Sequence, residues 1–144
     1  GDLITCREEI GTMKKAIGGA RLKVILETGI LAEPDRIYKA SMLAMEAGAD
    51  FIKTSTGKTT PGATPGALLV MCHAVKDFHL RTGHQVGVKP AGGIATTEQA
   101  VFYLTIVREI LGEGWMSPGL LRIGASRLAN HLLSNILNEE VNYF

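Results

Sequence analysis

The chain has 144 residues, of which 46% are hydrophobic and 20% are charged, and this composition is typical of one globular domain with a buried core. The formal net charge of +1 argues against a protein that binds nucleic acid or an anionic membrane surface. No apolar run approaches the roughly 18 residues of a membrane span, and the N-terminus has no signal-peptide pattern, so we expect a cytoplasmic location.

The pattern of apolar residues predicts strands that alternate with helices along the chain. After a leading polar helix at 7–18, strands are expected at 22–28, 50–55, 86–89 and 121–124. A helix follows each strand, and these helices are predicted at 34–48, 65–83, 96–112 and 126–137. We therefore expect a single domain over 1–144, with a leading helix in 1–20, four strand–helix units in 21–137 and a mobile tail in 138–144.

Three of the predicted helices begin with a capping signal. Thr64 precedes a proline at the first helical position, Pro65. Thr96 stands three residues before Gln99, which is the spacing of a capping box. Ser126 is the expected N-cap of the last helix.

The two faces of the predicted strands differ in polarity. One face of each of the first three strands is apolar, and the other carries a lysine: Lys23, Lys53 or Lys89. A doubly wound sheet is apolar on both faces, whereas a closed barrel surrounds a ligand site with the C-terminal ends of its strands. Because a (β/α)8 TIM barrel needs eight strands and about 250 residues, the α/β pattern predicts half of such a barrel, with four parallel strands each followed by a helix.

Lys53 and Lys89 are the candidate catalytic residues. Each ends an apolar strand and is followed by glycine-rich sequence. A free lysine has a pKa of about 10.4 and is protonated at neutral pH, but burial and a second ammonium nearby both favour the neutral amine. The pair therefore indicates an amine nucleophile that condenses with a carbonyl compound. Two lysines that merely extend to solvent are the structural alternative.

Glycine-rich loops follow three of the strands, at 57–58, 92–93 and 124–126. Backbone N–H groups of such loops at one edge of a sheet bind phosphate, and Lys58 adds a charge.

The two cysteines lack metal-ligand spacing, and no nucleotide-binding fingerprint is present, so we expect neither metal nor cofactor.

Several of these segments resemble the deoxyribose-phosphate aldolase family: residues 22–29, 47–50, 51–58, 88–94 and 123–126. The resemblance covers essentially residues 7–137 and implies the C-terminal half of a TIM barrel. It implies reversible, metal-free cleavage of 2-deoxy-D-ribose 5-phosphate into D-glyceraldehyde 3-phosphate and acetaldehyde through an imine and its enamine.

The resemblance also implies roles for individual residues. Lys53 forms the imine, and Lys89 is the second lysine that tunes it. The positions that bind substrate and phosphate are Thr56, Gly57, Lys58, Gly92, Gly93 and Ser126. Lys23, Arg127 and Tyr143 are further candidates, and Tyr143 matches a tyrosine that reaches the site from a flexible tail in some members.

The sequence departs from the family in two ways. The family's catalytic aspartate lies on a strand that this sequence does not contain, and Arg127 replaces a small residue after the phosphate-site serine. We therefore expect the isolated chain to be weak or inactive. One alternative is an inactive half-barrel that forms a phosphate-binding homo-oligomer or associates with the missing half. Another is a different phosphosugar lyase with the same imine chemistry.

Overall fold

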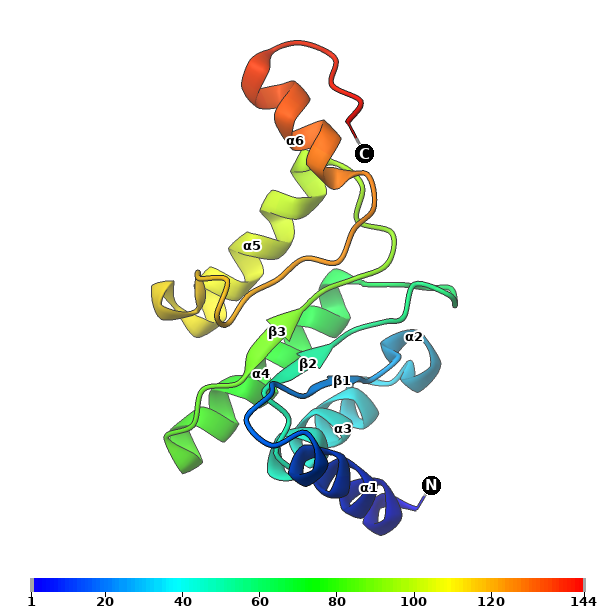
Figure 1. The fold of residues 1–144 in the computed structure, drawn as a ribbon, viewed down its shortest axis with the longest axis vertical. Helices are drawn as coiled ribbons and strands as arrows, with labels where there is room; N and C mark the ends of the chain where they lie inside the picture. Colours follow the sequence, from blue (N-terminus) through cyan, green and yellow to red (C-terminus); the bar gives the residue numbers. More distant parts are fainter. Residues whose placement is uncertain (1, 144) are drawn as a thin grey trace.

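The computed structural model describes residues 2–143 and centres on one parallel sheet with the strand order β1-β2-β3 (Figure 1). The strands are β1 (Lys23–Ile25), β2 (Phe51–Lys53) and β3 (Gly87–Lys89). The helices are α1 (Leu3–Ala16), α2 (Thr28–Leu31), α3 (Pro34–Glu46), α4 (Pro65–Thr82), α5 (Thr97–Leu111), the 3-10 helix η1 (Glu113–Trp115) and α6 (Leu128–Leu137). The predicted parallel α/β arrangement is confirmed.

The sheet has one covered face and one face that carries the lysines. Val24, Ile52 and Val88 are register partners, and the last two are fully buried against α3 and α4. The neighbouring positions point to the opposite face, where Ile25 at the end of β1 is 41% exposed. The face assignment made from the alternating pattern is therefore confirmed.

The predicted fourth strand at 121–124 is not a strand, because the structure has three strands within residues 2–143. The segment meets β3 at one isolated parallel bridge, Val88 to Leu121, and the residues after β3 at another, Ala91 to Gly124. Val88 donates its N–H to the Leu120 carbonyl at 2.8 Å, and Gly124 donates to the Pro90 carbonyl at 2.9 Å. Pro90 lies between the two bridged residues Val88 and Ala91 and has no N–H to donate, so the ladder is interrupted there.

The first strand is shorter than the predicted 22–28. It ends at Ile25, since Glu27 adopts a left-handed conformation with φ 53° and ψ 60° and Thr28 begins the short helix α2. The leading helix, in turn, begins earlier than predicted, at Leu3, because the Asp2 carboxylate accepts the Thr5 N–H at 3.0 Å and caps it.

The caps of α4 and α5 are as predicted. The Thr64 hydroxyl accepts the Ala67 N–H, and the capping box between Thr96 and Gln99 is complete. The predicted cap of the last helix is wrong. Helix α6 has Arg127 as its N-cap and no side-chain capping bond, because the helix begins at Leu128, one residue too late for the Ser126 hydroxyl to cap it.

The segment after α6 folds back along that helix. Val141 is buried and donates its N–H to the Ser134 hydroxyl at 3.0 Å, and the Tyr143 N–H bonds the Asn130 side chain at 3.1 Å. The expected mobility of 138–144 remains a prediction. Within residues 2–143, no helix has the length and apolar character needed to cross a membrane.

Candidate active site

Lys53 and Lys89 lie side by side at the C-terminal ends of β2 and β3. They are register partners in the parallel ladder, so both side chains leave the same face of the sheet, and both are half-buried. Lys23 starts β1 on that same face, where it is the partner of Phe51. The parallel register thus brings the two catalytic candidates together.

Four cations crowd this face. Burial lowers the pKa of Lys89 below its ordinary value, and the charges of Lys23, Lys53 and Arg122 lower it further. The Arg122 guanidinium carbon lies 4.9 Å from the centre of the Phe51 ring. None of the ion pairs found among the described residues involves these four cations. Lys89 is therefore the amine whose neutral form the surroundings favour.

A pocket of about 500 Å³ opens where the loops after β2 and β3 meet the segment 124–127. Its lining includes Lys53 and most of the predicted substrate- and phosphate-binding residues: Thr56, Gly57, Gly92, Gly93, Ser126 and Arg127. Two predicted residues, Lys58 and Lys89, do not line it, and neither do Lys23 and Tyr143. The structure thus brings the candidate nucleophile and three glycine-rich segments to one cavity.

Close backbone contacts fix these loops against one another. The Thr54 hydroxyl accepts the Ala91 N–H at 2.9 Å and donates to the Ala91 carbonyl at 3.0 Å. A side chain at Gly62 would place its Cβ 2.5 Å from the carbonyl oxygen of Gly92, which itself has a φ of 94°. Glycine is therefore required at both positions for the loops to pack this closely.

Glu27 is a site residue that the sequence reasoning missed. Its carboxylate accepts the Thr56 hydroxyl at 2.6 Å and the Thr56 N–H at 3.2 Å. The Thr56 hydroxyl holds the pKa of Glu27 below its ordinary value, and the nearby charge of Lys53 acts in the same direction. The signal in the sequence was that Glu27 lies four residues after Lys23 on the first predicted strand, so alternation places both on the face that carries the lysines.

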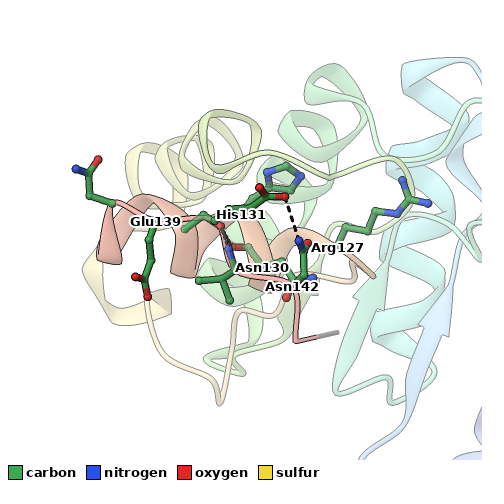
Figure 2. A pocket seen from close by; sticks show the side chains of 9 residues that line it. Arg127, Asn130, His131, Glu139 and Asn142 are labelled. Carbon is green, nitrogen blue, oxygen red and sulfur yellow. Dashed lines mark hydrogen bonds between the residues drawn. The ribbon is translucent and has the colours of Figure 1, made fainter.

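A second pocket, of about 710 Å³, lies between α6 and the segment that folds back along it (Figure 2). Its lining is polar and includes Asn130, His131, Glu139 and Asn142. Arg127 lines both pockets, and its side chain points away from Asn130 and His131 in Figure 2. No group of three or more metal-binding side chains occurs in the part of the chain that the structure describes.

Similarity to known proteins is extensive. Residues 2–112 match the model of the DeoC/LacD family of aldolases. Deoxyribose-phosphate aldolase from Bos taurus is 52% identical over 121 residues, covering 84% of this chain and 38% of that protein. The Mus musculus enzyme is 50% identical over 125 residues, covering 87% and 39%. The tetrameric deoxyribose phosphate aldolase structure from Aeropyrum pernix matches with a TM-score of 0.68 and 27% identity, covering 90% of this chain and 48% of that one. The chain thus spans less than half the length of these relatives.

Proposed function

The chain belongs to the DeoC/LacD family of aldolases, and from this premise we propose that it carries the imine-forming part of a deoxyribose-phosphate aldolase. The substrate would be 2-deoxy-D-ribose 5-phosphate, and the products D-glyceraldehyde 3-phosphate and acetaldehyde. The observation that carries the proposal is the pairing of Lys53 with Lys89 beside a pocket built from glycine-rich loops.

Lys53 is the proposed nucleophile. Its neutral amine attacks the aldehyde carbon C1 of the open-chain sugar, water leaves, and a protonated imine forms. A base then accepts the proton of the C3 hydroxyl and the C2–C3 bond breaks. C3 becomes the aldehyde carbon of the released D-glyceraldehyde 3-phosphate, and the bonding pair moves toward the protonated imine to give an enamine. Protonation of the enamine at C2 and hydrolysis release acetaldehyde and regenerate Lys53.

Lys89 has a tuning role in this proposal. One of two adjacent amines is more readily neutral when the other carries the proton, so the pair shares its titration. Burial and the neighbouring charges lower the pKa of Lys89, so its neutral amine is available to accept the proton from Lys53 before the attack. Lys23 and Arg122 support this role by adding positive charge nearby.

The glycine-rich pocket is proposed to bind the 5-phosphate. Backbone N–H groups around Gly57, Gly92 and Gly93 form an anion-binding concavity, and Arg127 at its rim adds a charge. Lys58 is proposed as a second cation from the same loop. Because the chain spans less than half the length of its relatives, we expect weak activity from the chain alone.

Reductive trapping tests the nucleophile. The chain is incubated with acetaldehyde and borohydride, digested and analysed by mass spectrometry. We expect a reduced two-carbon adduct at Lys53, with Lys39 as the internal control because it lies on the surface and its side chain is 65% exposed. Equal labelling of both lysines would contradict the assignment, and replacement of Lys53 by methionine should remove the adduct.

A second candidate function is an inactive half-barrel that binds phosphate as an oligomer. It is favoured by the exposed Ile25 on the lysine-bearing face of the sheet and by the tetrameric relative. Light scattering that shows a monomer would count against it. A different phosphosugar lyase with the same imine chemistry would be revealed by a panel of aldehyde donors.

A further inference from the structure

Glu27 joins two loops that lie far apart in the sequence. It follows β1 in a left-handed backbone conformation, which is sterically unfavourable for any residue with a Cβ. Such a conformation persists where surrounding contacts hold it, and it is concentrated at functional sites. The contact that accompanies it here is the bond between the Glu27 side chain and the loop after β2.

Two donors of one residue meet this carboxylate. The Thr56 hydroxyl lies 2.6 Å from one oxygen, and the Thr56 N–H lies 3.2 Å from each oxygen. A carboxylate only accepts hydrogen bonds, so it suits a residue that offers two donors, and its charge strengthens both bonds. The same hydroxyl then accepts the Lys58 N–H at 3.1 Å. Glu27 thereby fixes residues 56–58 of the loop.

The far end of this loop is fixed differently. Ala63 donates its N–H to the Gly92 carbonyl at 3.0 Å, and Gly62 lies against the backbone of Gly92. Residues 56–58 have no comparable backbone bond to another loop among those found in the described chain, so Glu27 is their anchor. Thr56 and Gly57 both line the pocket.

We propose that Glu27 is a positioning residue that holds the loop 56–58 in the conformation that binds the phosphate group of the substrate. This role rests on the proposed function, because it assumes that the pocket takes a phosphate. Glu27 bonds the loop and its charge opposes that of Lys53, so its loss should weaken phosphate binding without lowering imine formation with a substrate that lacks phosphate.

The test compares Glu27→Asn with Glu27→Gln. Asparagine tolerates the left-handed conformation, but its amide is one methylene too short to reach Thr56. Glutamine keeps the reach and one acceptor oxygen. Glu33→Gln is the matched control, because Glu33 precedes α3 and makes no side-chain capping bond. Binding of inorganic phosphate is measured by titration calorimetry, and Lys53 trapping by acetaldehyde and borohydride is measured without phosphate.

We expect Glu27→Asn to weaken phosphate binding by roughly tenfold, because the side chain no longer reaches the two Thr56 donors. Glu27→Gln should restore most of the affinity, and trapping at Lys53 should not fall below the parent level in either variant. Unchanged phosphate affinity in Glu27→Asn overturns the inference, as does a parallel loss of affinity and trapping, which would show a merely structural role. A parent chain that binds no phosphate also overturns it. A parent that binds phosphate through Glu27 but gives no Lys53 adduct refutes the proposed aldolase function and leaves the inference standing.

Discussion

Lys53 and Lys89 occupy partnered positions at the ends of adjacent parallel strands, so the backbone of the sheet itself holds their amines near each other. Neighbouring strands lie about 4.8 Å apart, and the charge of Lys53 lowers the pKa of Lys89. The surroundings add Lys23 and Arg122 to the same face. The pKa of Lys89 therefore reports the positive charge around the pair.

Replacement of Arg122 by glutamine should raise the pKa of Lys89. Burial is the largest cause of the lowered pKa of Lys89, and Arg122 is one of three cations that lower it further. Removal of the Arg122 charge should therefore move the pKa of Lys89 back toward 10.5. Side-chain NMR titration of the lysine amines measures the shift. Arg36→Gln, which removes a charge that does not act on Lys89, is the control, and an equal response in both variants would contradict the assignment.

The same pKa predicts how stability depends on pH. The folded chain loses the Lys89 proton at a lower pH than the unfolded chain, so the unfolded state binds more protons between the folded pKa and 10.5. The contribution of Lys89 to the free energy of unfolding should therefore rise with pH across that interval. Urea titrations of the parent and of Lys89→Met should converge toward high pH, and curves that diverge there would refute the prediction.

Asp50 should stabilise the fold in a manner that is lost in acid. Burial alone would raise its pKa, but the Lys14 ammonium at 2.5 Å and the Leu22 N–H at 2.6 Å outweigh burial and lower the pKa below 3.8. Asp50→Asn should lower the free energy of unfolding at neutral pH by about 1 kcal/mol or less, since the pair is partly exposed. This difference is fully present above 3.8 and disappears as pH falls through the folded pKa. Asp35→Asn, at an exposed ion pair, should show a smaller effect.

Ser126 and Thr96 should respond differently to alanine. Thr96 completes a capping box, so Thr96→Ala should lower the free energy of unfolding by about 1 kcal/mol. Ser126 caps nothing in the structure and lines the pocket, so Ser126→Ala should leave stability unchanged and weaken phosphate binding. Chemical denaturation and phosphate titration of both variants provide the measurement. A destabilised Ser126→Ala variant with normal phosphate affinity would show that Ser126 supports the helix and does not bind phosphate.

Gly87 should not tolerate a side chain. A Cβ at this position would overlap the Phe51 ring, so Gly87→Ala should lower the free energy of unfolding by about 1–3 kcal/mol through overpacking. Gly66 in α4 is the control, because a Cβ there meets no atom within 4 Å and alanine favours the helix by about 0.5–1 kcal/mol. Urea denaturation followed by circular dichroism should thus separate the two variants in opposite directions.

The sequence predicted the long helices α3, α4 and α5 and the polarity of the strands well, because both depend on local patterns, but it did not predict the short helices α2 and η1. Helices α3 to α5 begin and end near their predicted residues, since Pro34, Thr64, Thr96 and the glycines after α4 and α5 act within a few positions of the helix ends. The face that carries the lysines follows from strict alternation along each strand.

The remaining features depend on contacts between distant segments. Strand pairing at 121–124 depends on Pro90, which lies about thirty residues earlier and removes the donor that a continuous ladder requires. Glu27 and Thr56 are separated by 29 positions, and their bond exists only because β1 and β2 are neighbours. The apolar residue Leu26 continues the alternating pattern of the first strand, so the strand was predicted to run too far. The pattern of polarity does not reveal that Glu27 adopts a left-handed conformation, which ends the strand.

The intrinsic fluorescence of Trp115 can be used to follow the unfolding of the chain. It is the only tryptophan in the chain, it is buried, and its N–H donates to the Val86 carbonyl at 3.0 Å, just before β3 begins. The glycine-rich pocket lies beyond the opposite end of that strand. The fluorescence of Trp115 should therefore change when the chain unfolds and stay constant when a ligand enters the pocket. Unfolding can then be followed by fluorescence in the presence of ligand without interference from binding.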